Sequence, residues 1–214
     1  MLIIKFSKTE EAAYIPHLDT LRAFIRTLKR AEIPVKSSLG FNPHMCLYFS
    51  SPIPLGLETM SEYCAIETGF DDKDFIEKFN ANSPQGLKCC MAKSVIKNPN
   101  FANILCATEY KIEIENLKNY KETIGGILNA PFVLEYSTKT KTVKKDFRPL
   151  IYSIKHEGDV LTCVFSSGKE NLRHDIFIDA ILKLTNLNNV VSVLKTAQFY
   201  FDRGVLINAD NFFK

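Results

Sequence analysis

The sequence places strand-like and helix-like segments in the same order twice along its 214 residues. In the first half, short apolar runs typical of strands surround two segments with the apolar spacing of amphipathic helices. The predicted strands cover residues 2–6, 45–49, 62–68 and 87–96, and the predicted helices cover residues 17–32 and a segment that begins at residue 71. This βαββαβ order is that of the ferredoxin-like fold.

Residues 97–103 separate the two halves, because they combine a proline between asparagines with little periodicity. The pattern then begins again, with strands at 109–115, 132–137 and 190–200, helices at 120–128 and 175–187, and a hairpin through 156–159. We therefore predict an α+β protein of two tandem ferredoxin-like domains, residues 1–105 and 106–214, the second carrying an inserted basic arm or hairpin.

Composition limits the possible functions. A hydrophobic content of 46% is enough for a buried core, and a net charge of +3 is too small to predict nucleic-acid binding without local clusters of cations. The six cysteines are scattered and lack the close spacing of a zinc or iron–sulfur site. We expect a reduced, cytoplasmic chain with no disulfides, no cofactor, no metal and no membrane-spanning segment.

The first predicted helix has a basic flank opposite its apolar side. This flank consists of Arg22, Arg26, Lys29 and Arg30. It could be an ordinary solvated face, since Asp19 lies three residues before Arg22 and cations are favourable near a helix C-terminus. It could also bind phosphates, for which the planar arginine fork is well suited. The residues alone leave both interpretations open.

A second basic cluster lies in the predicted arm. It consists of Lys139, Lys141, Lys144, Lys145 and Arg148. In an extended strand Lys139 and Lys141 share a face, so the segment could be an edge strand that lysines protect from aggregation. Asp146 could also pair with Arg148. The density of cations favours a nucleic-acid-binding arm, and we expect it to form one electropositive tract with the basic helix.

Two histidines lie at predicted element ends that are stiffened by proline. His17 starts the first helix, and His44 follows a loop in which Gly40 permits a positive φ and the Asn42-Pro43 pair favours a turn. Either histidine could serve as a base or a ligand, or could simply belong to a helix cap or a connecting turn.

A site built on these histidines needs further groups. Asp19 and Glu62 could complete it, as partners that orient an imidazole or as oxygen ligands of a divalent metal. The chain contains no HxH or HExxH pattern, so the spacing gives no support for a metal site. We expect that, if a site exists, His17 and His44 approach each other across one cavity.

Several short motifs are similar to those of one protein family. They are His17-Leu18-Asp19, Lys29-Arg30-Ala31, Gly40-Phe41-Asn42-Pro43-His44, Pro54-Leu55-Gly56, Glu62-Tyr63 and Asp146-Phe147-Arg148-Pro149-Leu150. Through these motifs most of the chain resembles the radical-SAM-linked domain family of unknown function. The resemblance implies a cobalamin-binding radical-SAM protein as partner, and it implies no reaction for the domain itself.

These observations support three hypotheses of different classes. The first is a non-catalytic accessory module that binds tRNA or rRNA for modification by a separate radical-SAM enzyme. The second is an endonuclease-like RNA-processing enzyme that uses His17 and His44. Against it, the last forty residues contain a single glycine, Gly204, and so lack the glycine-rich loop of such nucleases. The third is a protein that binds a metal or a small molecule.

Overall fold

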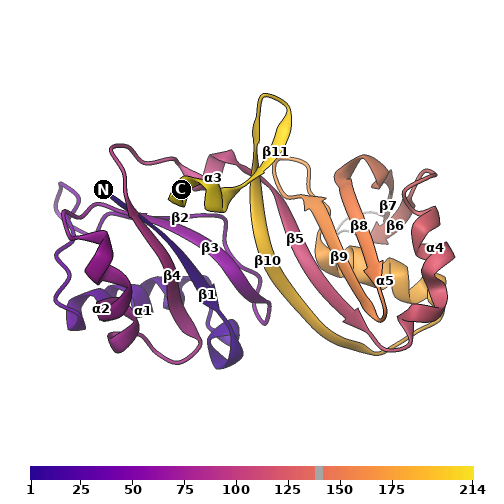
Figure 1. The fold of residues 1–214 in the computed structure, drawn as a ribbon, viewed down its shortest axis with the longest axis horizontal. Helices are drawn as coiled ribbons and strands as arrows, with labels where there is room; N and C mark the ends of the chain where they lie inside the picture. The colour runs from indigo at the N-terminus through magenta and orange to yellow at the C-terminus, as the bar shows by residue number, and fades with distance from the viewer. Residues whose placement is uncertain (138–141) are drawn as a thin grey trace. The chain divides into compact units, whose positions relative to one another are not determined.

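The computed structural model describes residues 1–137 and 142–214, and these residues form two compact units (Figure 1). Unit 1 contains Met1–Leu105 and Tyr200–Lys214, and unit 2 contains Cys106–Phe199. The predicted α+β class is confirmed. The predicted second domain spans residues 106–214, whereas the end of the chain from Tyr200 lies in unit 1.

Unit 1 begins with the βαββαβ order over residues 2–94. Its regular elements are β1 (Leu2–Lys8), α1 (His17–Arg30), β2 (Leu47–Phe49), β3 (Glu58–Ile66), α2 (Asp72–Asn82), β4 (Leu87–Ser94), α3 (Phe101–Ile104) and β11 (Val205–Asn208), with the 3-10 helices η1 (Glu10–Tyr14) and η4 (Ala209–Phe213). Strand β1 pairs with β4 and β3, and β2 pairs with β3, each antiparallel.

Strand β1 is buried on both faces, which explains its nearly continuous apolar sequence. Phe6 points to the helix-covered face, where its ring meets that of Phe24 of α1 at a centroid distance of 4.8 Å. Ile3 points to the other face, where it packs in a cluster with Tyr63 and Phe101. The sheet of unit 1 therefore has a core on each side.

The C-terminal segment belongs to unit 1 because it covers this second face. Ala209 is fully buried there, and the Asp210 carboxylate accepts hydrogen bonds from the Lys5 amine and the Tyr63 hydroxyl, both at 2.7 Å. Burial raises the pKa of Tyr63, so its hydroxyl keeps the proton that it donates. A sequence-based boundary at residue 105 could not anticipate this return of the chain.

Unit 2 repeats strands and helices around one core. Its elements are β5 (Leu105–Ile114), α4 (Lys121–Gly126), β6 (Val133–Ser137), β7 (Thr142–Asp146), β8 (Ile151–Glu157), β9 (Val160–Ser166), α5 (His174–Thr185) and β10 (Val190–Asp202), with the 3-10 helices η2 (Leu117–Tyr120) and η3 (Arg148–Leu150). The strand order is β10-β5-β9-β8, and β6 and β7 form a separate hairpin. Phe165 and Phe177 meet in the core at 4.6 Å.

None of the helices in the described residues has the length and apolar character that a bilayer-spanning helix needs.

Candidate nucleic-acid interface

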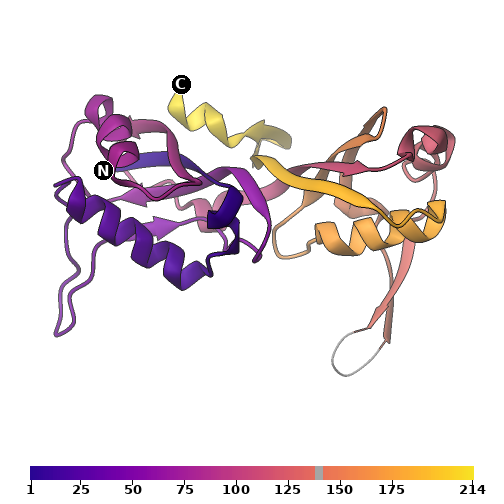
Figure 2. The ribbon, with the colours of Figure 1, turned by 90° about the horizontal axis from the view of Figure 1, so that it is seen from below.

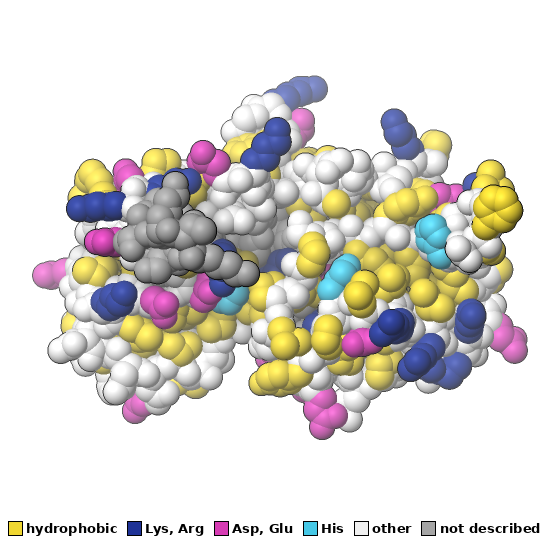
Figure 3. Space-filling view, turned by 180° about the vertical axis from the view of Figure 1, so that it is seen from behind, with side chains coloured by type: hydrophobic (Ala, Val, Ile, Leu, Met, Phe, Trp, Pro, Cys, Tyr) yellow, Lys and Arg dark blue, Asp and Glu magenta, His cyan; other side chains and the backbone are white. Residues whose placement is uncertain are grey.

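Helix α1 presents arginines on one exposed flank and buries the opposite side. Phe24 and Leu28 are buried in the core of unit 1, while Arg22, Arg26 and Arg30 recur every four residues and are exposed. Figure 3 shows Lys and Arg side chains gathered over α1 on this face of the molecule. The predicted amphipathic helix with a basic flank is confirmed.

The three arginines line one pocket of about 470 Å³, which we call the arginine pocket. Its lining residues are Ile15, Asp19, Arg22, Ala23, Arg26, Arg30 and Pro84. The pocket therefore combines α1 with the segment before it and with the turn after α2. Lys29, the fourth predicted cation, is exposed on α1 but does not line this pocket.

The arginines differ in what already occupies their guanidinium groups. Arg22 forms an ion pair with Asp19 at 2.7 Å, and Arg30 donates to the backbone oxygen of Asn82 at 2.5 Å. Arg26, between them, makes no hydrogen bond or ion pair with any of the described residues. Its fork of donors is available to an anion that enters the pocket.

A buried lysine fixes one wall of this pocket. The Lys8 amine donates to the backbone oxygen of Ile15 at 2.7 Å and to that of Ala13 at 3.2 Å, and the residue is only 1% exposed. Burial lowers the pKa of Lys8, and the charge of Glu62 partly offsets this by raising it. Lys8, which lies just beyond the predicted strand of residues 2–6, therefore holds the backbone that leads into α1.

Glu62, a predicted catalytic or ligand candidate, lies buried in β3. Its carboxylate accepts hydrogen bonds from the Thr59 hydroxyl at 2.8 Å and the Ser50 hydroxyl at 3.2 Å. These contacts, together with the charge that it exerts on Lys8, indicate that Glu62 stabilises the fold.

The two histidine candidates have separate surroundings. The His17 ring packs edge-on against Phe49 at a centroid distance of 6.1 Å, and Nδ1 of His44 hydrogen bonds with the Ser38 hydroxyl at 2.8 Å. Neither histidine lines the arginine pocket, where Asp19 is found. The contacts described for His17, His44 and Asp19 therefore involve different partners.

The loop of residues 38–44 stands out from unit 1 at the lower left of Figure 2. Its base is closed by hydrogen bonds between Ser38 and His44, and Gly40 has the positive φ of 121° that the sequence predicted to be permitted there. Asn42 and Pro43 complete the turn. Phe41, whose exposure sequence reasoning missed, is fully exposed at the tip.

In unit 2 only part of the predicted basic arm can be placed, since Lys139 and Lys141 lie outside the described residues. Lys144 is exposed on β7, while Lys145 pairs with Glu170 at 3.8 Å. Arg148 donates to the backbone oxygens of Leu128 and Ile151, at 2.8 and 2.9 Å. Its guanidinium thus supports the local fold, and Asp146 accepts from the Arg148 backbone N–H rather than from the predicted side-chain pair.

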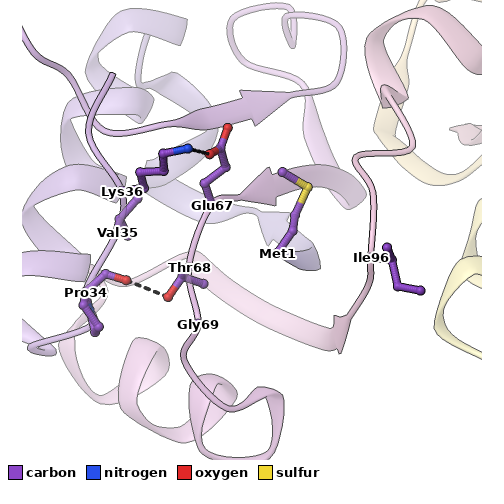
Figure 4. Close-up of a pocket in the computed structure, with 8 residues that line it drawn as sticks. All are labelled: Met1, Pro34, Val35, Lys36, Glu67, Thr68, Gly69 and Ile96. Carbon is purple, nitrogen blue, oxygen red and sulfur yellow. Dashed lines mark hydrogen bonds and ion pairs between the residues drawn. The ribbon is translucent and has the colours of Figure 1, made fainter. Parts of the chain in front are cut away.

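A second pocket in unit 1, of about 610 Å³, is shown in Figure 4. We call it the paired pocket because its charged groups bind one another. The Glu67 carboxylate contacts the Lys36 amine at 3.1 Å and accepts from the Tyr48 hydroxyl at 2.6 Å. These two partners lower the pKa of Glu67, chiefly through the Tyr48 hydrogen bond. In addition, the Thr68 hydroxyl donates to the backbone oxygen of Pro34 at 2.6 Å.

Among residues 1–137 and 142–214, no group of three or more His, Cys, Asp or Glu side chains is arranged to hold a metal ion. The hypothesis of a metal-binding protein therefore gains no support from this part of the chain.

Comparison with protein families matches residues 1–174 to a family described as an uncharacterised protein conserved in bacteria (DUF2344). The chain belongs to this family. The matched region contains every residue that lines the arginine pocket and the paired pocket. It ends at the first residue of α5, so most of α5, all of β10 and the C-terminal segment of unit 1 lie beyond it.

No curated protein matches this DUF2344 chain. One similar solved structure is entitled "Crystal Structure of a Cbf5-Nop10-Gar1 Complex", with a TM-score of 0.46 and 11% sequence identity. The alignment covers 94% of this chain and 50% of that one, so this chain spans about half the length of that protein.

Proposed function

We propose that this DUF2344 protein is a non-catalytic accessory module that binds tRNA or rRNA in the cytoplasm and works with a separate radical-SAM enzyme. The observation that carries the RNA-binding part is Arg26, a guanidinium without a partner among the described residues, between two other arginines of one pocket. Phosphodiester groups are the ligands that a row of arginine forks fits best. The radical-SAM partner rests on the family resemblance in the sequence.

We also propose that both units are ferredoxin-like domains. Support comes from the order of strands across the sheet. This order is β4-β1-β3-β2 in unit 1, and the corresponding order in unit 2 is β10-β5-β9-β8. On this interpretation the β6–β7 hairpin is the insertion in the second domain, and Lys144 on it is a further phosphate contact.

The competing endonuclease hypothesis needs His17 and His44 to act on one phosphodiester. Their described partners are Phe49 for His17 and Ser38 for His44, so the described contacts do not bring the two histidines to one phosphodiester. Binding without cleavage is therefore the function that the arrangement favours.

A salt titration of RNA binding tests the proposal. Binding of a fluorescently labelled tRNA is measured by anisotropy between about 50 and about 200 mM salt, for the unmodified protein, Arg26→Gln and Lys73→Gln. We expect Arg26→Gln to make the log–log salt slope shallower by about one. Lys73 is the matched control, because it is an exposed cation of unit 1 on α2 rather than α1. Equal slopes for Arg26→Gln and the unmodified protein would contradict the proposal, as would the absence of RNA binding at low salt.

The radical-SAM partner is tested separately by co-purification of the tagged protein from a cell that encodes both proteins. Recovery of the enzyme is the expected result. Recovery of RNA without the enzyme would leave an RNA-binding protein with no radical-SAM role.

A further inference from the structure

Tyr14 is 70% exposed and directly precedes a residue that lines the arginine pocket. It is the last residue of η1, and the next residue, Ile15, lines the pocket. An exposed aromatic side chain alone is common on protein surfaces and indicates no ligand. The backbone around Tyr14 makes this one different.

That backbone is fixed from two sides. The Lys8 amine binds the oxygens of Ala13 and Ile15, the two residues that flank Tyr14. The backbone N–H of Gly56 donates to the same Ala13 oxygen at 3.0 Å. Tyr14 therefore projects from a segment whose position is set before any ligand arrives.

The Tyr14 ring is also supported. Its Cε1 atom lies 3.6 Å from the point where a β-carbon at Gly56 would stand, so the ring edge rests beside this glycine. Gly56 has a φ of +79°, which suits glycine and makes a side chain at this position strained. The ring is thus held at one edge and remains open to solvent over most of its surface.

An ordered, exposed aromatic ring and a cation without a protein partner are the two kinds of group that bind single-stranded nucleic acid. Aromatic rings stack on unpaired bases, while cations contact the backbone that joins them. A base in a duplex is already stacked on its neighbours and cannot cover an additional ring without being extruded.

We propose that Tyr14 stacks on an unpaired base of single-stranded RNA whose phosphate binds Arg26 in the arginine pocket. This inference rests on the proposed RNA-binding function and narrows it to single-stranded segments. Because the ring is positioned in advance, little conformational entropy is lost when the base stacks.

Tyr14→Trp gives a direct reporter, because the sequence contains no tryptophan and the new indole would be the only one. Titration with a single-stranded oligoribonucleotide should quench this fluorescence, while a duplex of the same length should quench it far less. Unchanged fluorescence when anisotropy shows the oligonucleotide to be bound would overturn the stacking proposal.

Affinity measurements provide the second readout. Tyr14→Ala should weaken binding of the single strand by roughly tenfold, the scale of one base stacked on an aromatic ring, and Tyr14→Phe should restore it. Phe41→Ala is the matched control, since Phe41 is another exposed aromatic of unit 1, on the 38–44 loop. Equal losses for Tyr14→Ala and Phe41→Ala would overturn a specific role for Tyr14.

The two proposals can fail separately. If Arg26→Gln flattens the salt slope but Tyr14→Ala leaves affinity for single strands unchanged, backbone binding stands and stacking is wrong. If no RNA binds at low salt, both are wrong.

Discussion

The two pockets of unit 1 are lined by charged residues, but only the arginine pocket has a charged side chain without a partner among the described residues. In the paired pocket, Glu67 binds both Lys36 and Tyr48, so the charged and polar groups satisfy one another. In the arginine pocket, Asp19 neutralises only Arg22, and Arg26 is left without a described partner. The paired pocket is the larger, at about 610 Å³ against about 470 Å³.

The balance of charge in a pocket, rather than its volume, therefore identifies the better candidate for an anion site. An ion pair that is already formed must be broken before either partner can bind a ligand, which costs part of the interaction gained. A free guanidinium meets no such cost and can form two parallel hydrogen bonds with a phosphate.

The largest expected effect comes from reversing charge in the arginine pocket. The double variant Arg22→Glu with Arg26→Glu should weaken RNA binding by about a hundredfold, the loss expected for two charge-assisted contacts. A single charge reversal in the paired pocket, Lys36→Glu, should change affinity far less than half of that effect on a logarithmic scale. Anisotropy titrations at one salt concentration measure both.

Circular dichroism of the double variant and of Lys36→Glu checks that a loss of RNA binding does not come from unfolding. The double variant should remain folded, because Phe24 and Leu28, on the buried side of α1, are unchanged. If Lys36→Glu weakens binding as much as the double variant, the contrast between the pockets is wrong and RNA responds only to overall charge.

The next effect concerns the wall of the arginine pocket. Lys8→Met removes the donor of the Ala13 and Ile15 oxygens and should lower the free energy of unfolding by about 2 kcal/mol, the scale of a buried acceptor left unsatisfied. Urea denaturation measures this loss. Tryptophan at position 14 should at the same time lose its quenching by RNA, because the segment is no longer held.

The pH dependence of stability in the same variant tests whether burial lowers the pKa of Lys8. Burial lowers the folded pKa of Lys8 below its ordinary 10.5, so between these two values the unfolded chain binds the extra proton. Stability of the unmodified protein should therefore rise as pH increases through this window, and Lys8→Met should lose that rise. An identical pH profile for both proteins would show that Lys8 is not desolvated.

Much of unit 1 was predictable because local chemistry determines it. Helix α1 begins at His17 as predicted, directly after Pro16, and Asp71 caps α2 by accepting from the backbone N–H of Lys73 at 2.9 Å. The helix ends at Arg30, before the predicted Glu32, because Ala31 already forms its C-terminal cap. The basic flank of α1 follows from helical spacing alone.

The parts that sequence reasoning missed depend on contacts between distant segments. The arginine pocket needs Pro84, more than fifty positions from Arg30, and its wall needs Lys8, which lies outside the predicted strand of residues 2–6. Elements α3 and η4 cover the second face of the sheet in segments without clear periodicity. No sequence pattern singles out Tyr14, since the support of its ring comes from Gly56, a distant position in the chain.

A smaller effect is expected in the paired pocket. The Tyr48 hydroxyl and Lys36 lower the pKa of Glu67 below its ordinary 4.5, so the stability that Glu67 contributes is present above that value and is lost as pH falls through the lower, folded pKa. Glu67→Gln should remove this contribution. Thermal unfolding at about pH 7 should show a small loss in the variant, with the two proteins converging at low pH, because exposed ion pairs contribute little. RNA affinity should not change, and a loss of RNA binding would assign the paired pocket a role that we do not expect.

The smallest expected effect is a gain, and it distinguishes the two interpretations of Asp19. As the partner of Arg22 in the arginine pocket, Asp19 competes with an incoming phosphate. Asp19→Asn should free that guanidinium and tighten RNA binding by up to about fivefold, the upper range for an exposed ion pair, with a steeper salt slope. Lys73→Gln again serves as the control for an unrelated charge change. If Asp19 instead orients a histidine or holds a metal that RNA requires, the same substitution weakens binding. A weaker complex would therefore return Asp19 to the group of catalytic or ligand candidates, whereas a tighter one identifies it as the group that keeps the arginine pocket partly neutral until RNA arrives.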